Sequence, residues 1–432
     1  MKRFFILLFL IFCVTSLWAE DSITELTGLY PKTAICKEHT PYVYMSMIIN
    51  TGIGSEADYN MGMATFISKL LLQKTRHTSA DEVERIFYSS GCSLSLSVNL
   101  DYIEIKTITL KKDFFRAINI IGECLTEPKV TNEDIEKAKA ESIDQMTETY
   151  DSSFQRMYDT LRQNIYTGNP YKRQLYGTVQ SIKSINKSMI AQYYKENFSL
   201  YDITVAVAGD VTEDFVTDCV EKAFVQGYRT KKRNPFEYED RLKENKTVEI
   251  KNYDKDENIT YYYCGYLFPG AKDKDYYACL LLSEILGSGK SSLVFRNIRQ
   301  KYGIGYMIGF KYETLKRQSH AYLYMSCINS SDRLEIAKEE YRNIVDTIKA
   351  QGVPEDDLEK SKMYIKEQRN IENLDLLKKA HNICVSEAVF GTADAYTQFD
   401  RKIDSITNKD IKEAAVKYMK NYCEIISRPF SE

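Results

Sequence analysis

The sequence predicts an α+β protein made of two homologous domains, and three observations lead to this prediction. First, residues 131–139 resemble residues 354–362, and the two segments start 223 residues apart. Second, residues 184–190 resemble residues 405–411 at a nearly equal spacing of 221. Third, alternating strand-like stretches and long amphipathic helices occur without the regular βαβ spacing of a doubly wound sheet. Each half should therefore contain a mainly antiparallel sheet.

The division of the chain follows from its charge pattern and its start. Residues 229–246 contain 11 charged residues of 18 and a proline, as expected for a solvated linker. We therefore expect an N-terminal domain over 20–228 and a C-terminal domain over 247–432. Strand-like alternation over 203–208 and 260–267 falls on either side of this linker.

Residues 1–19 have the layout of a secretory signal peptide. Lys2 and Arg3 precede an apolar run over 4–14, and Ala19 offers a cleavage point. This predicts export to the periplasm or the extracellular space. Leu17 stands where a small residue is usual, so an uncleaved membrane anchor remains the alternative; no other stretch reaches the ~20 apolar residues of a membrane span.

Composition excludes one class of partner and leaves the redox state open. The net charge of −3, without a stripe of basic residues, argues against nucleic acid binding. Nine cysteines follow residue 19, with no metal-binding spacing, and an odd number leaves at least one thiol outside any intramolecular disulfide. The four histidines share no i,i+4 spacing, which disfavours a zinc site built from them.

Residues 62–75 carry the resemblance that decides the functional interpretation. This segment resembles the helix bearing the H-x-x-E-H motif in the insulinase/pitrilysin metallopeptidase family. Thr65 and Lys69 stand at the histidine positions, Ser68 stands at the position of the glutamate base, and Met146 stands at the third ligand position on a second helix. A lysine ammonium has no lone pair to offer a metal, so this resemblance implies a degenerate site that holds no zinc.

Other segments extend the resemblance along nearly the whole chain. Residues 91–102 look like the strand that pairs with substrate backbone in the family, which implies substrate contacts at Gly91 and at Ser95, where asparagine is usual. Residues 286–296 resemble the glycine turn and helix of the family's C-terminal domain, with Gly287 and Gly289 as implied substrate contacts. Residues 299–306 then resemble its paired arginine and tyrosine, here Arg299 and Tyr306.

The resemblance implies a clam shell of two halves, each a sheet covered on one face by helices, and a divided active site. In the family, the arginine and tyrosine hold the substrate backbone and the oxygen that becomes negative during zinc-assisted attack. Because this chain lacks the ligands and the base, we expect no cofactor on it, and Arg299 and Tyr306 would complete the site of a homologous, zinc-bearing H-x-x-E-H subunit. Peptides are the implied substrate class.

Three alternatives remain open. The chain could be a non-catalytic scaffold that binds a peptide or assembles with other proteins, or a self-sufficient protease with unusual metal ligands. Taken singly, Arg299 could also be an ordinary helix-end cation, and Tyr306 could pack in a core with Ile308 and Phe310. The placement of this pair distinguishes the two main hypotheses: if Arg299 and Tyr306 point into a shared chamber, catalytic complementation is favoured, and if they pack away from it, a scaffold is favoured.

Overall fold

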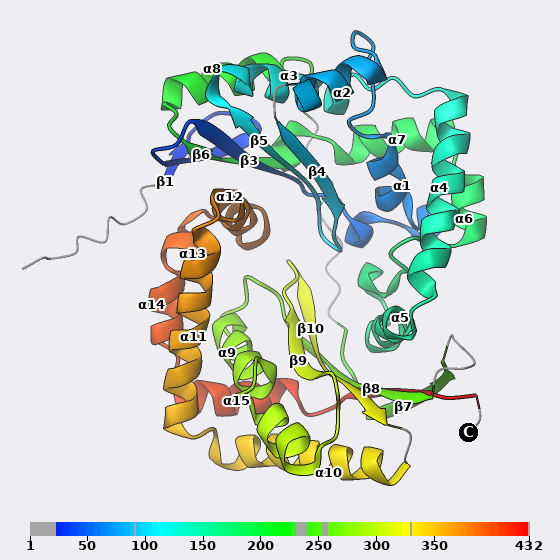
Figure 1. The fold of residues 1–432 in the computed structure, drawn as a ribbon, viewed down its shortest axis with the longest axis vertical. Helices are drawn as coiled ribbons and strands as arrows, with labels where there is room; N and C mark the ends of the chain where they lie inside the picture. The colour runs from blue at the N-terminus through cyan, green and yellow to red at the C-terminus, as the bar shows by residue number, and fades with distance from the viewer. Residues whose placement is uncertain are drawn as a thin grey trace, which may run out of the picture.

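Two mainly antiparallel sheets, one from each half of the chain, form the framework of the protein (Figure 1). The structure is a computed structural model that describes residues 23–89, 92–227, 229, 240–252, 258–328 and 331–430. The predicted α+β class is confirmed. The predicted signal peptide over 1–19 and Gly91 lie outside the described residues. So do residue 228, at the end of the predicted N-terminal domain, and residues 230–239 of the predicted linker.

The first sheet has six strands in the order β1-β2-β6-β3-β5-β4. Neighbouring strands are antiparallel except for the parallel pair β2 and β6. β4 therefore lies at one edge. The strands are β1 (Ile23–Leu26), β2 (Lys32–Lys37), β3 (Tyr42–Ile49), β4 (Ser93–Val98), β5 (Ile103–Leu110) and β6 (Ile203–Gly209).

The second sheet has five strands in the order β7-β11-β8-β10-β9. It too contains one parallel pair, β11 with β7. β9 lies at the edge that corresponds to β4 in the first sheet. The strands are β7 (Lys246–Lys251), β8 (Ile259–Pro269), β9 (Ile308–Glu313), β10 (Gln318–Ile328) and β11 (Cys423–Arg428).

Helices surround both sheets. The first half contributes α1 (Met63–Leu70), α2 (Ala80–Ser89), α3 (Phe114–Thr126), α4 (Asn132–Tyr150), α5 (Ser153–Ile165), α6 (Val179–Ser184), α7 (Lys187–Asn197) and α8 (Glu213–Ala223). The second half contributes α9 (Tyr276–Gly287), α10 (Ser331–Gln351), α11 (Glu355–Asn373), α12 (Leu376–Val385), α13 (Asp394–Thr397), α14 (Phe399–Asp404) and α15 (Asn408–Tyr418), with π-helical turns at Phe295–Gln300 and Ser386–Phe390. Short 3-10 turns occupy Ile53–Ser55, Asp58–Asn60, Lys111–Asp113, Pro170–Lys172 and Leu200–Asp202.

The repeated sequence segments form matching helices. α4 and α11 each have 19 residues and start at 132 and 355, while α7 and α15 each have 11 and start at 187 and 408. α5 and α12 start at 153 and 376, the same 223 residues apart. The chain order and lengths of these helices agree with an internal duplication. β7 begins at Lys246, the last residue of the predicted linker.

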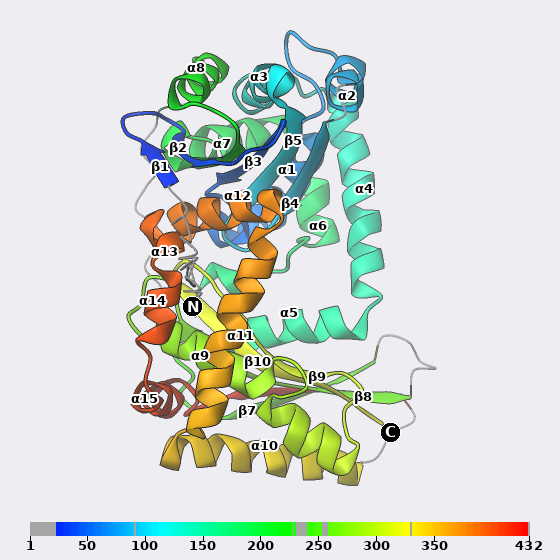
Figure 2. The same cartoon turned by 60° about the vertical axis from the view of Figure 1, so that its left-hand side comes forward.

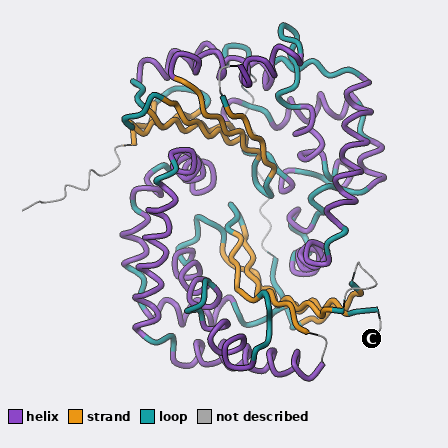
Figure 3. The backbone as a smooth tube through the Cα atoms, in the orientation of Figure 1, coloured by secondary structure: helices purple, strands orange, loops and turns teal. Residues whose placement is uncertain are grey.

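Each sheet carries helices on both faces, and not on one face as the resemblance implied. α12 of the second half covers the free face of the first sheet, where Ala380 and Ile383 pack with Ile48 (Figure 3). α5 of the first half covers the free face of the second sheet, where Leu161 packs with Tyr263. The two halves thus exchange equivalent helices, because each strand set is apolar on both faces and one layer of helices leaves one face bare.

Polar contacts strengthen this exchange. Lys379 on α12 forms an ion pair with Glu38 at 2.6 Å, and His381 Nδ1 lies 2.6 Å from the buried carboxylate of Glu104 on β5. The backbone N–H of Lys316, in the β9–β10 turn, donates to Asp101 in the β4–β5 turn at 2.7 Å. The two halves are therefore joined at several separate places.

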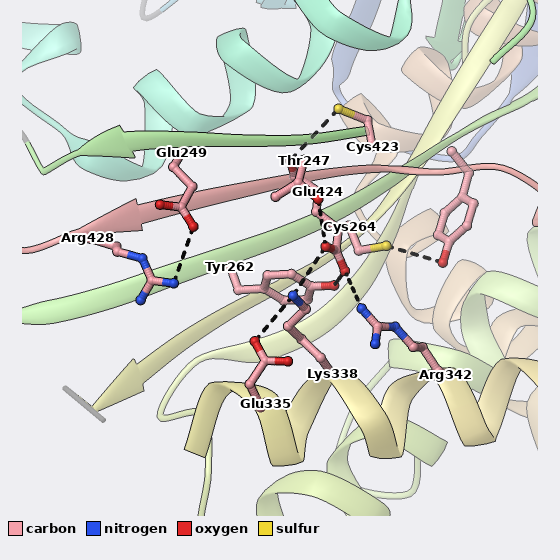
Figure 4. Close-up of polar contacts among 11 residues, drawn as sticks. Thr247, Glu249, Tyr262, Cys264, Glu335, Lys338, Arg342, Cys423, Glu424 and Arg428 are labelled. Atoms are coloured by element: carbon pink, nitrogen blue, oxygen red, sulfur yellow. Dashed lines mark hydrogen bonds and ion pairs between the residues drawn. The ribbon is translucent and has the colours of Figure 1, made fainter. Parts of the chain in front are cut away.

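A buried carboxylate anchors α10 to the second sheet (Figure 4). Glu424 on β11 accepts a hydrogen bond from the Tyr262 hydroxyl at 2.7 Å and lies 3.3 Å from both Lys338 and Arg342 of α10. Burial by itself would raise the pKa of Glu424, but the Tyr262 hydroxyl and the two cations outweigh it and hold that pKa below its usual value.

Two further observations concern the membrane and the thiols. Among the described helices, none is long and apolar enough to cross a bilayer. Among the described cysteines, seven are buried: Cys36, Cys124, Cys219, Cys264, Cys279, Cys384 and Cys423. Most of the predicted cysteine set therefore serves as small apolar side chains in this structure.

Candidate functional site: a closed helix pair and an exposed arginine–tyrosine pair

The predicted metal helix, α1, begins at the buried carboxyl group of Glu56. Gly62 precedes it with φ 85°, and Glu56 accepts hydrogen bonds from the backbone N–H groups of Gly62 and Ala64, both at 2.8 Å. These groups would otherwise be unsatisfied at the start of the helix. Burial raises the pKa of Glu56 to about 8, although the two N–H groups and Arg173 oppose that rise. No sequence pattern around Glu56 had indicated this cap.

The three polar side chains at the degenerate positions form hydrogen bonds within the protein. Thr65 Oγ1 donates to the carbonyl oxygen of Leu175 at 2.8 Å, and Ser68 Oγ donates to that of Thr65 at 2.6 Å. Lys69 Nζ donates to Gln145 Oε1 on α4 at 2.8 Å. Gln145 stands next to the predicted position Met146, which is half-buried. The sequence placed the correct two helices together but did not reveal the lysine–glutamine contact.

These residues do not fit a zinc ion. A threonine hydroxyl, an ammonium and a thioether supply neither the imidazoles nor the carboxylate of a zinc site, and the ammonium repels a cation. Among the described residues, no group of three histidine, cysteine, aspartate or glutamate side chains is placed to hold a metal. No reaction step through a metal can be derived from these side chains.

The edge strand β4 presents a polar face. Ser93, Ser95 and Ser97 are exposed. The alternate residues Leu94, Leu96 and Val98 pack against the hydrophobic core of the first half of the chain. Among the described strands, only β5 pairs with β4, which is therefore an edge strand. Ser95 lies on this edge strand, and its role as a substrate contact stays a prediction.

Arg299 and Tyr306 lie together in the second half. Gly303, with φ 67°, ends the helix that carries Arg299. The Arg299 guanidinium lies 5.4 Å from the centre of the Tyr306 ring, and its Nη1 donates to the carbonyl oxygen of Tyr306 at 2.7 Å and to that of Gly305. Tyr306 is 84% exposed, so its predicted alternative as a core residue is wrong.

The backbone around this pair differs slightly from the expected extended run over 304–310. Gly305 takes φ 83°, and β9 starts only at Ile308. This turn places the Tyr306 carbonyl beside Arg299. The helix of Arg299 packs beside α10, and α10 and α1 lie toward opposite ends of the long axis in Figures 1 and 2. The pair is therefore not assembled with α1 within this chain.

The two predicted glycine contacts have different surroundings. A Cβ on Gly287 would clash with the backbone nitrogen of Phe310, so this glycine allows α9 to approach β9. Gly289 takes φ 70° in an open turn, and no other atom lies within 4 Å of the position that a Cβ would take. The packing of the helix on the sheet explains Gly287, and a substrate role for either glycine stays a prediction.

The fold and the site together define a class: a two-domain peptidase fold whose metal positions hold no metal ligands. Residues 32–179 match the family described as "Insulinase (Peptidase family M16)", and residues 184–365 match the "Peptidase M16 inactive domain". The chain belongs to this insulinase family, peptidase family M16.

Individual relatives are distant. An "Uncharacterized zinc protease" of Rickettsia bellii is 21% identical over 87% of this chain and 90% of its own length. A "Non-peptidase homolog YmxG" of Helicobacter pylori is 22% identical over 73% and 72%. A "Probable mitochondrial-processing peptidase subunit beta" of Schizosaccharomyces pombe is 22% identical, but the match spans only 46% of this chain and 45% of that protein.

A solved structure, "The crystal structure of a protease from Helicobacter pylori", superposes with a TM-score of 0.86 at 16% identity. It covers 95% of this chain and 100% of that one. At this identity the likeness establishes the fold. The chemistry depends on the side chains that this chain places on it.

Proposed function

We propose that this chain is the zinc-free subunit of an exported insulinase-family metallopeptidase. It supplies Arg299 and Tyr306 to the active site of a homologous subunit that carries H-x-x-E-H and the zinc ion. The observation that carries the proposal is the exposed phenol of Tyr306, held beside the guanidinium of Arg299 while the metal positions are occupied by internal contacts.

The chemistry of the pair suits this role. A guanidinium and a phenol are both hydrogen-bond donors, and donors fixed in advance stabilise the negative oxygen that develops during peptide hydrolysis. The two backbone carbonyls that hold Arg299 fix its position before a substrate arrives. Exposure leaves Tyr306 accessible to another protein chain. A subunit relationship is also suggested by the partial match to a mitochondrial-processing peptidase subunit.

The test is peptide cleavage by the purified protein, alone and mixed with an H-x-x-E-H homologue from the same source. We expect cleavage only in the mixture, reduced about 100-fold or more by Arg299→Ala, as for the loss of an oxyanion donor. Tyr306→Phe should have a similar effect. Tyr88→Phe is the matched control, because Tyr88 is also an exposed tyrosine, at 78%, and lies on α2.

A scaffold is the second candidate. It is favoured by the hydrogen bonds that already engage Arg299 and by the relative named a non-peptidase homologue. In that case the exposed edge of β4, including Ser95, would hold an extended peptide without cleavage. Complex formation with no activity in any mixture would replace the first candidate with this one.

The proposed export has its own test. Residues 1–19 motivate it, and N-terminal sequencing of the protein from its source organism should find Glu20 as the first residue. A mature chain that still begins at Met1 and remains with the membrane fraction would support the uncleaved anchor. A chain beginning at Met1 in the cytoplasm would contradict export.

A further inference from the structure

A cavity of about 430 Å³ lies in the second half, between helices for which the metal-site resemblance gives no role. Residues of α9, α11, α12 and α14 line it, and Figure 2 shows where these helices lie in the fold. The duplication pairs α11 with α4, and α9 follows β8 as α1 follows β3. The cavity is therefore the counterpart, in the second half, of the α1–α4 contact that a lysine closes in the first half.

The walls of the cavity combine aromatic rings with polar and charged side chains. Ring–ring contacts fix part of them: the Tyr276 and Phe390 centroids are 5.1 Å apart, and those of Tyr277 and Phe399 are 6.0 Å apart. Its size is within the usual range of a small-molecule site, and its mixture of rings and polar groups suits a ligand that is part apolar and part polar. Six rings line it in all: Tyr276, Tyr277, Tyr364, Phe390, Tyr396 and Phe399.

One carboxylate in the wall lacks a countercharge. Glu284 on α9 lines the cavity, and its Oε1 atom is buried without a hydrogen-bond partner. Within the described residues, Glu284 forms no ion pair. Burial raises its pKa, while a hydrogen bond from Ser288 opposes that rise. A buried carboxylate in this state gains from a cation brought to it.

The other charged groups of the cavity are already engaged. Arg369 lies 4.3 Å from the Tyr396 ring and 4.5 Å from the Phe399 ring, and it pairs with Asp400 at 3.6 Å. Glu372 pairs with Lys378 at 3.1 Å. Glu284 is thus the charge in the wall that remains to be matched.

We propose that this cavity binds an organic cation: an ammonium or guanidinium group on an apolar or aromatic body. The cation pairs with Glu284, and the apolar body lies among the six rings. The same chemistry occurs in free amines and in the basic side chains of peptides. This site is separate from Arg299 and Tyr306, and the proposal does not depend on peptide cleavage.

The experiment measures binding of 2-phenylethylamine to the full chain by calorimetry, with 2-phenylethanol as the uncharged analogue. We expect a dissociation constant on the order of 1 mM for the amine, typical of so small a ligand. Glu284→Gln should weaken amine binding about tenfold and leave the alcohol unchanged, because only the charge-assisted contact is lost. Glu372→Gln, in the same wall but already paired, is the control and should change amine affinity less than about threefold.

Three results would each overturn the proposal. They are equal affinities for the amine and the alcohol, no saturable binding of the amine, and an unchanged affinity of the Glu284→Gln variant for the amine. If that variant does not fold, a crystal of the native chain soaked in the amine decides: density beside Glu284 supports the site, and density only elsewhere overturns it. N-acetyl-phenylalanyl-lysine amide distinguishes the sources. Binding of this peptide that depends on Glu284 assigns the site to basic side chains, and binding of the amine alone assigns it to free amines.

Discussion

The α1–α4 helix pair and its counterpart α9–α11 use the same scaffold in opposite ways. Between α1 and α4, the Lys69–Gln145 hydrogen bond closes the position where the family holds its metal. Between α9 and α11 lies an aromatic cavity with the unmatched carboxylate of Glu284. The two duplicated helix pairs therefore share a backbone arrangement, and the side chains between the helices determine whether that space is filled or forms a cavity.

The largest expected effect concerns a buried ion pair within α5, one of the two exchanged helices. On α5, Arg162 and Asp159 form a buried ion pair at 2.6 Å, with 1% and 4% of their side chains exposed. Arg162→Met leaves Asp159 charged and unpaired in the interior, so we expect the free energy of unfolding to fall by about 3–5 kcal/mol. Urea titration measures it.

The equivalent change on α12 is the control. Lys379→Met removes an ion pair whose partner, Glu38, has 27% of its side chain exposed, so water can replace the lost contact. We expect a loss of about 1 kcal/mol. Equal losses for the two variants would contradict the expectation that the more deeply buried ion pair costs more to break.

Glu104 lies where α12 meets the first sheet, and its contribution to the free energy of unfolding should depend on pH. Burial opposes its ionisation, but His381, Ser46 and Lys106 outweigh burial and lower its pKa. A lowered pKa in the folded state contributes stability above the unfolded pKa and loses it as pH falls through the folded value. Glu104→Gln should therefore cost about 2 kcal/mol at pH 7 and progressively less toward pH 3. A cost that grows on acidification contradicts this assignment.

Glu56, at the start of α1, should show the opposite sign. Its folded pKa of about 8 lies above the usual 4.5, so the folded chain keeps a proton that the unfolded chain loses, and its contribution falls as pH rises from 4.5 to 8. Glu56→Gln places an amide against two N–H donors and should cost about 1–2 kcal/mol at pH 5. Thermal unfolding should find this cost shrinking toward pH 8; a constant cost would mean that Glu56 is ionised throughout.

Sequence patterns predicted the repeated elements well because local signals start them. Thr131 with Asp134 and Thr407 with Asp410 form capping boxes at the starts of α4 and α15, and both segments were found by their resemblance to the other half. The exchange of α5 and α12 was missed, since a helix's apolar face does not say which sheet it will cover. The same limit applies to Glu284, because nothing near it in the sequence marks the cavity.

The smallest expected effect concerns the contact that closes the first helix pair. Lys69→Met keeps a long apolar stem but removes the ammonium that reaches Gln145, and Lys69 is half-buried, so water can satisfy the amide. We expect the free energy of unfolding to change by less than about 1 kcal/mol. Cleavage by the mixture with an H-x-x-E-H subunit should also be unchanged, because the proposed contribution comes from Arg299 and Tyr306. Loss of that activity in a folded Lys69→Met variant would move the functional site of this chain from the second half to the first.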